Sequence, residues 1–124
     1  MRPSLRTALY IASGIVAMLP AIASAQDSAA GKAVFAQCAV CHSVDGTNGV
    51  GPSLKGVVGR KSGTAEGFRY SRAMKGSGIT WDAASLDTYV ADPQKLIPGN
   101  VMPFSGIADA KQRADLVAYL ATLK

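Results

Sequence analysis

The sequence predicts an all-α fold in which four to five short helices are joined by long irregular loops. The clearest helical pattern lies near the C-terminus, where apolar residues recur at i, i+3, i+4 and i+7: Leu116, Tyr119, Leu120 and Leu123. Between residues 43 and 69, seven of 27 residues are glycine, which excludes an ordinary helix or a well-packed strand. No segment alternates convincingly between apolar and polar residues and no repeat is found, so no sheet or solenoid is predicted.

The composition is that of one globular domain. The chain has 124 residues, of which 48% are apolar and 17% charged, and this balance excludes a disordered tail, a collagen-like repeat and a low-complexity protein. Three Phe, four Tyr and one Trp supply few large side chains for a core, so we expect something else to help fill it. The formal net charge of +5 favours acidic partners, but Lys and Arg are scattered, so nucleic-acid binding is not predicted.

Residues 1–25 have the three-part layout of a secretory signal peptide. The segment starts with two arginines, continues with an apolar stretch over 8–19 and ends with small residues before Gln26, where we expect cleavage. The mature domain, 26–124, then has eleven Lys and Arg against eight Asp and Glu, a net charge of +3. The alternative is an uncleaved membrane anchor, but 12 apolar residues span only about 18 Å of a hydrocarbon core about 30 Å thick. We therefore predict a periplasmic protein that contacts a membrane only if this segment is retained.

The mature chain is predicted to start with a helix. Asp27 or Ser28 can cap its N-terminus, and apolar residues that include Val34, Phe35 and Cys38 share one of its faces. The glycine-rich stretch that follows is a loop of unusual length for a compact domain. We expect this loop to wrap around a group other than its own side chains.

Further helices are predicted in the second half of the chain. A short helix begins at Ser71, and a longer one runs over 82–92. Pro93 ends the longer helix and can start one more turn. The last helix has Asp109 as its N-cap with Gln112 three residues on, in the manner of a capping box.

Cys38, Cys41 and His42 are the only cysteines and the only histidine of the chain, and they lie within five residues. A thioredoxin-type redox site needs a βαβ pattern, which is absent, and a zinc site needs four ligands, where only three Cys and His residues exist. The remaining hypothesis is covalent haem attachment, for which Cys-x-x-Cys-His is typical. Two thiols one helical turn apart add to the two haem vinyl groups, and the next residue places an imidazole under the iron.

A sixth iron ligand is expected among the remaining soft donors of the mature chain, Met74 and Met102. Met102 lies in a Pro/Gly-rich stretch that cannot pack as regular structure, so its side chain needs a target there; the alternative is a place in the core. Met74 lies on the short helix that begins at Ser71, where packing in the core is its expected role. We predict Met102 as the ligand.

Eight segments together resemble class I cytochromes c, in that family's order and at close to its spacing: 31–35, 38–42, 51–56, 59–63, 67–71, 79–81, 98–102 and 113–120. The resemblance covers nearly the whole mature chain. It implies the class I cytochrome c fold, with helices and long loops wrapped around one covalently bound haem c. It also implies that Cys38 and Cys41 hold the haem, that His42 is the proximal ligand, and that Met102 is the sixth.

The resemblance also implies which residues bind the haem propionates. Arg60, Tyr70 and Trp81 stand where the family makes these contacts, and the Asn100 amide is placed to serve a propionate too. For Arg60 the alternative is a solvated charge, whereas core packing accompanies any such contact of Trp81.

The ligands themselves are expected to have partners. By the resemblance, the Pro52 carbonyl accepts the His42 ring N–H, which fixes the tautomer, and the Tyr89 hydroxyl reaches the Met102 sulfur. The crossing of the first and last helices is expected at Gly31, Phe35, Leu116 and Tyr119.

The sequence departs from the family pattern in two respects. Met74 stands where many relatives have an asparagine beside a buried water, so this site is more apolar here. The lysine ring around the exposed haem edge is thinned: Lys95 remains, but other residues stand at or beside ring positions, namely Gln94, Val101, Ala108 and Asp109.

The function implied is that of an electron carrier rather than an enzyme. Six-coordinate His/Met haem has no open position for a substrate, and the chain has no second histidine to act as a distal acid or base. A haem enzyme such as a peroxidase and a gas-binding module are the alternatives. The expected partners are redox proteins: a quinol:cytochrome c oxidoreductase, a terminal oxidase, a photosynthetic reaction centre or a periplasmic dehydrogenase. The carrier is expected to be a monomer.

Overall fold

A computed structural model describes residues 14–18 and 26–124 of the chain. Its five helices are α1 (Ser28–Phe35), α2 (Arg72–Gly76), α3 (Ala83–Ala91), α4 (Pro93–Leu96) and α5 (Ala110–Leu120). Over the described residues no strand is present beyond an isolated bridge between Lys61 and Thr80. The all-α prediction is therefore confirmed. Most of the predicted signal peptide lies outside the described residues.

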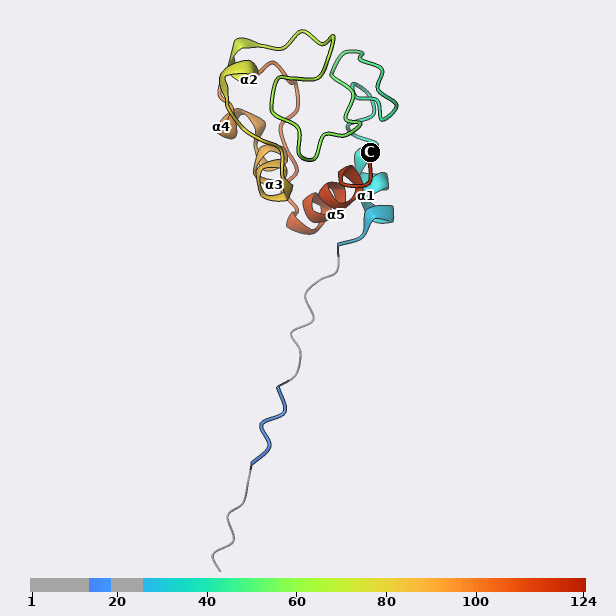
Figure 1. Cartoon of the computed structure of the whole chain (residues 1–124). Coiled ribbons are helices and arrows are strands. Elements are labelled where there is room, and N and C mark those ends of the chain that lie inside the picture. The colour runs from blue at the N-terminus through green and yellow to red at the C-terminus, as the bar shows by residue number, and fades with distance from the viewer. Residues whose placement is uncertain (1–13, 19–25) are drawn as a thin grey trace, which may run out of the picture.

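The helices lie along the lower end and one flank of the domain in Figure 1, and the long loop between α1 and α2 arches over the rest. At the lower end α1 and α5 lie side by side, and this pair forms the most extensive helix–helix contact. α3 packs on α5 and α4 on α3, while α2 lies at the upper left.

Each helix has a side-chain cap at its N-terminus. Asp27 accepts hydrogen bonds from the N–H groups of Ala29 and Ala30, and Asp109 accepts one from the N–H of Gln112. A reciprocal capping box is present at Asp82 and Ser85 in α3. At α5 only the Asp109 half of the predicted box forms, because no return bond from the Gln112 side chain is found over residues 26–124.

The crossing of α1 and α5 requires a glycine at position 31. A Cβ atom on Gly31 would overlap the backbone carbonyl of Asp115 and would lie 2.9 Å from the Cβ of Tyr119. Beside this contact the rings of Phe35 and Tyr119 pack with their centroids 5.3 Å apart. The buried Asp115 carboxylate accepts hydrogen bonds from the Asp27 N–H at 2.9 Å and from Lys111 at 2.5 Å, which fastens the start of α1 to α5.

We expect Gly31→Ala to lower the free energy of unfolding by about 1–3 kcal/mol, because the added methyl group forces the two backbones apart. Denaturant unfolding of the holoprotein measures this change. Gly76→Ala in α2 is the matched control, since nothing lies within 4 Å of an added Cβ there and alanine is the better helix former. Equal stability of Gly31→Ala and wild type would contradict the close crossing.

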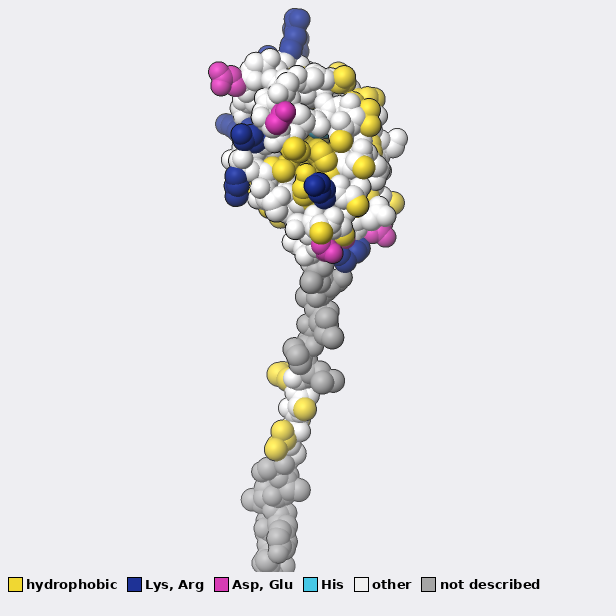
Figure 2. Space-filling model, turned by 90° about the vertical axis from the view of Figure 1, so that its right-hand side faces the viewer, with side chains coloured by type: hydrophobic (Ala, Val, Ile, Leu, Met, Phe, Trp, Pro, Cys, Tyr) yellow, Lys and Arg dark blue, Asp and Glu magenta, His cyan; other side chains and the backbone are white. Residues whose placement is uncertain are grey.

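A compact set of buried side chains lies between the helices and the loops. Among the residues that the structure describes, ten hydrophobic side chains form this buried set: Phe35, Val57, Trp81, Leu86, Tyr89, Ile97, Ile107, Leu116, Val117 and Leu120. On the surface, hydrophobic side chains gather in the middle of one face while most charged side chains are spread around it (Figure 2). Within the described part of the chain, no helix is both long and apolar enough to cross a membrane.

Candidate functional site

A cavity of about 490 Å³ lies between the helices and the arching loop. This volume is in the range of small-molecule and cofactor sites. Its wall includes Leu86 of α3 and Leu116 and Leu120 of α5, together with many loop residues. All ten residues that the sequence singled out for a cofactor site lie in this wall: Cys38, Cys41, His42, Pro52, Arg60, Tyr70, Trp81, Tyr89, Asn100 and Met102.

Cys38 and Cys41 lie on turns that continue from the C-terminal end of α1. The N–H of Cys41 and the N–H of His42 both donate to the carbonyl of Cys38, at 3.1 and 2.9 Å, so the backbone keeps a helical course over this motif. Both thiols are free and half-buried, and burial raises the pKa of the Cys38 thiol. Over the described residues no strand is present, so the βαβ surroundings that a redox-disulfide site needs are missing. A zinc site also lacks support, because no group of three His, Cys, Asp or Glu within 14–18 and 26–124 could hold a metal.

The His42 ring is fixed against the backbone of the following loop. Its Nδ1–H donates to the carbonyl oxygen of Pro52 at 2.7 Å, the contact that the sequence resemblance implied. A Cβ on Gly51 would lie 2.6 Å from Cε1 of the ring, so only glycine lets the ring approach this closely. Burial lowers the pKa of His42; the Pro52 hydrogen bond opposes this shift, and the positive charge of Arg60 adds to it. The ring is therefore held neutral, with Nε2 left as a lone-pair donor.

Met102 is held by two polar side chains that also line the cavity. The Tyr89 hydroxyl donates to the Met102 sulfur at 3.8 Å, again the contact that the resemblance implied. Burial raises the pKa of Tyr89 to about 12, so the hydroxyl keeps its proton at neutral pH. The Met102 N–H donates to Oδ1 of Asn100 at 2.9 Å. Sulfur and backbone of this residue are thus both fixed.

The Asn100 amide is engaged differently from the expected propionate contact. Its Nδ2 donates to the carbonyls of Pro93 and Ile97, at 3.0 and 2.9 Å, which takes both amide hydrogens. The residue is 6% exposed. The sequence identified Asn100 as part of the site, but in this structure its polar atoms hold the loop that carries Met102.

Donors with free capacity remain in the cavity wall. The Trp81 ring lies in the cavity wall and packs on Tyr89 at a centroid distance of 5.0 Å. The Tyr70 hydroxyl accepts from the Ala65 N–H at 3.0 Å, and its O–H can donate to a ligand. The Arg60 guanidinium donates to the carbonyls of Ser53 and Lys55, which brings a positive charge to the wall. These groups suit a ligand with negatively charged substituents.

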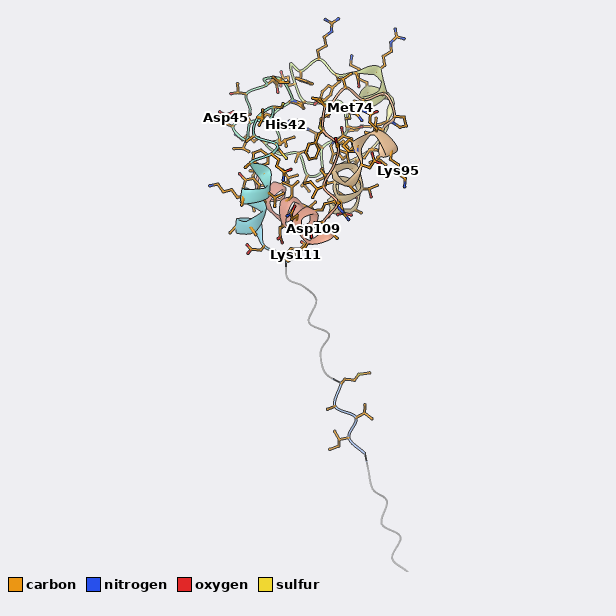
Figure 3. All side chains as sticks on the ribbon, turned by 180° about the vertical axis from the view of Figure 1, so that it is seen from behind. His42, Asp45, Met74, Lys95, Asp109 and Lys111 are labelled. Carbon is orange, nitrogen blue, oxygen red and sulfur yellow. The ribbon has the colours of Figure 1, made fainter. Side chains whose placement is uncertain are left out.

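Met74 lies in the same cavity wall as Met102 and packs against the core. Figure 3 shows Met74 in the upper half of the domain, at about the height of His42, with Asp109 and Lys111 at the lower end. Among the described residues, no side-chain hydrogen bond to the Met74 sulfur is found, in contrast to Met102. Of these two methionines, Met102 is therefore the one whose sulfur is held in place by a polar side chain.

The sequence missed two residues that shape the site. Gly51 makes room for the His42 ring, and its position directly before Pro52 was an available signal. Gln94 forms hydrogen bonds to the loop before Met102: its Nε2 donates to the Asn100 carbonyl and its Oε1 accepts from the Gly99 N–H. The sequence indicated only that Gln94 replaces a lysine, and no pattern could have shown this contact.

An apolar cavity walled by helices and long loops, with Cys-x-x-Cys-His in its wall, is typical of a protein that binds haem covalently. The chain belongs to the cytochrome c family, whose model, described as cytochrome c, matches residues 28–124. It is 49% identical to cytochrome c2 of Blastochloris viridis over 108 residues, 86% of this chain and 85% of that protein. It is 53% identical to cytochrome c2 of Rhodoplanes tepidamans over 98 residues, 77% and 92% of the two chains.

Solved structures agree with this assignment. Cytochrome cH from Methylobacterium extorquens superposes with a TM-score of 0.75 at 52% identity, covering 77% of this chain and 98% of that one. Ferricytochrome c2 from Rhodopseudomonas palustris superposes with a TM-score of 0.74 at 45% identity, covering 79% and 99%. The fold is thus that of class I cytochromes c, the cofactor is one covalently bound haem c, and the chain is a single-haem electron carrier.

Proposed function

We propose that the chain is a periplasmic electron carrier in which Cys38 and Cys41 attach haem c and His42 and Met102 bind its iron. The observation that carries this proposal is the cavity wall, which contains both free thiols, the fixed His42 ring and the fixed Met102 sulfur. When bound, haem c supplies a one-electron Fe(III)/Fe(II) couple. A methionine ligand raises the potential of such a couple.

The chain's own residues serve this function by holding two ligands still. Pro52 fixes the tautomer of His42 so that Nε2 is the free donor. Tyr89 and Asn100 orient Met102 through its sulfur and its N–H. A site held in this way changes little between the two oxidation states, which favours electron transfer.

Arg60, Tyr70 and Trp81 are proposed to bind the haem propionates. Each has a donor in or near the cavity wall, and the Tyr70 hydroxyl, which accepts from the Ala65 N–H, can still donate its hydrogen to a ligand. A buried carboxylate needs such donors, because its charge is otherwise costly to remove from water. Asn100 can join them only by giving up a hydrogen bond to Pro93 or Ile97.

An enzymatic role is disfavoured by the residues around the cavity. A peroxidase needs an open iron and a distal acid or base, and the chain has no histidine besides His42. A gas-binding module needs a labile sixth ligand, whereas Tyr89 and Asn100 both secure Met102. We therefore propose a carrier that is not an enzyme.

The location that we propose is inferred from the N-terminal segment, and the partners are inferred from the electron-carrier function. Residues 1–25 are proposed to be a cleaved signal peptide, with the mature carrier at 26–124 in the periplasm. The proposed partners are a quinol:cytochrome c oxidoreductase, a terminal oxidase, a photosynthetic reaction centre or a periplasmic dehydrogenase. The carrier is proposed to act as a monomer.

A redox titration of the holoprotein followed by its absorption spectrum tests the carrier function. We expect a single reversible one-electron transition with low-spin spectra in both oxidation states. Added peroxide should not drive steady oxidation of a reducing substrate. High-spin iron in the resting protein, or sustained peroxide turnover, would contradict a closed electron-transfer site and favour the alternatives.

Electron exchange with an acidic partner should depend only moderately on salt. Lys95 is an exposed charge on α4, whereas Val101 presents a hydrocarbon side chain, 77% exposed, at the cavity mouth. Exposed charges are screened over about 8 Å at physiological ionic strength. A surface with few charges therefore speeds the encounter with an acidic partner only weakly. We expect Lys95→Gln to flatten the plot of second-order rate constant against ionic strength, and Val101→Lys to steepen it.

Stopped-flow rates for the three proteins with one acidic partner measure this dependence. Equal slopes for wild type and both variants would mean that electrostatic docking does not use this face. Apolar contact through the exposed side chains at the cavity mouth, Val40, Val50 and Val101, would then carry the docking.

A further inference from the structure

The Gln94 side chain forms a two-sided clamp on the segment that carries Met102. Its Nε2–H donates to the carbonyl oxygen of Asn100 at 2.8 Å, and its Oε1 accepts from the N–H of Gly99 at 3.2 Å. One side-chain amide thus forms hydrogen bonds with the N–H of one residue and with the carbonyl of the next. Gln94 belongs to α4, a helix of four residues, so the clamp ties α4 to the loop that follows it.

Asn100 continues the connection from the clamp to Met102. Its carbonyl accepts from Gln94, and its side chain accepts from the Met102 N–H at 2.9 Å. Its amide hydrogens are donated to the Pro93 and Ile97 carbonyls at the two ends of α4. Hydrogen bonds therefore run without a gap from the Gln94 side chain through Asn100 to the backbone of Met102.

The two amides differ in burial, which separates their roles. Asn100 is 6% exposed, so its removal would leave backbone groups unsatisfied inside the protein. Gln94 lies at the surface, and its replacement opens no cavity in the core. Gly99, between them, has φ of +85°, in the left-handed region that glycine adopts most readily. Gln94 thus adds an outer pair of hydrogen bonds to a segment that Asn100 also ties to Pro93 and Ile97.

We propose that Gln94 is a positioning residue that sets how often the Met102 side chain leaves the cavity. This inference deepens the proposed function and rests on His42–Met102 ligation for its effect at the iron. Loss of the clamp raises the population of the open segment, in which Met102 is released from its place beside Tyr89. A free ligand that must wait for this opening then binds in proportion to the open population.

Gln94→Ala in the holoprotein tests the proposal with two readouts. The first is hydrogen exchange of the Gly99 and Met102 amides by NMR. The second is the rate of imidazole binding to the oxidised protein. We expect both to rise by about tenfold, which is the scale of one or two water-exposed hydrogen bonds. A purely structural role at the surface would change neither the exchange at Met102 nor the imidazole rate.

Two further variants sharpen the comparison. Gln94→Glu keeps an acceptor for the Gly99 N–H but loses the donor to Asn100, so Gly99 should stay protected while exchange at Met102 rises. Gln112→Ala is the matched control, because Gln112 is an exposed glutamine on α5 whose side chain makes no hydrogen bond within the described part of the chain. It should leave both readouts at the wild-type values.

The possible results distinguish a failure of the Gln94 clamp from a failure of the proposed His42–Met102 ligation. Unchanged exchange at Gly99 in Gln94→Ala would overturn the clamp. Faster exchange at Gly99 with unchanged exchange at Met102 and unchanged imidazole binding would show that the clamp does not reach Met102, and would also overturn the proposal. A wild-type holoprotein without a sulfur-to-iron charge-transfer band would instead refute the ligation, and exchange at Met102 would then decide for or against positioning by Gln94.

Discussion

Met102→Ala is expected to open the sixth coordination position of the holoprotein, lower its reduction potential and create a site for small ligands. Under the proposed ligation, an added ligand must wait for a minor state in which Met102 has left, and such states are typically populated at about 0.1–10%. Removing the methionine should therefore raise the apparent affinity for imidazole by about 10- to 1000-fold. Equilibrium titration of the oxidised protein measures the affinity, and a redox titration measures the potential.

Met74→Leu is the matched control for this prediction. Met74 lies in the same cavity wall and packs against the core, and leucine keeps most of its apolar contacts. The variant should retain the low-spin spectrum and the weak imidazole affinity of the wild type. If instead Met74→Leu opened the iron and Met102→Ala left it closed, Met74 would be the ligand.

The double variant Cys38→Ala plus Cys41→Ala should leave the exported chain largely unfolded. Without haem, the apolar wall of the cavity of about 490 Å³ faces water. Apolar surface left in water forfeits about 25 cal/mol of stabilisation per Å², whereas the whole stability of a small domain is only about 5–15 kcal/mol. Circular dichroism during heating should show a weak, non-cooperative change.

Val40→Ala is the control for the cysteine variant. Val40 lies between the two cysteines and is 82% exposed, so its truncation removes neither a thiol nor a core contact. This variant should bind haem and unfold cooperatively. A cooperative, native-like transition in the haem-free double variant would show that the fold does not depend on the cofactor.

The helices and the cavity wall could be predicted because each depends on a local signal. Asp27, one of two candidates, and Asp109 were predicted as N-caps, and both cap their helices. The predicted helix starts at Ser71 and at 82 also coincide with N-caps, Ser71 and Asp82. The glycine density of residues 43–69 predicted a loop wrapped around a group, and the structure places a cavity there.

The interactions that hold the ligands could be predicted only in part. The resemblance implied the contacts of Pro52 and Tyr89, and both are present. The bonds of Asn100 to Pro93 and Ile97 depend on how a four-residue helix turns into the next loop, which no periodicity records. The Gln94 clamp is similar, because a surface glutamine has no sequence signature when its partners are backbone atoms.

The absorption spectrum of the oxidised wild-type holoprotein decides whether His42 and Met102 bind the iron together. A sulfur-to-iron charge-transfer band on a low-spin spectrum is the predicted result, since the Met102 sulfur is held in the cavity wall by Tyr89 and no second histidine exists to replace it. The band should persist in Met74→Leu and vanish in Met102→Ala. A resting high-spin spectrum, or a low-spin spectrum without this band, would contradict His/Met ligation.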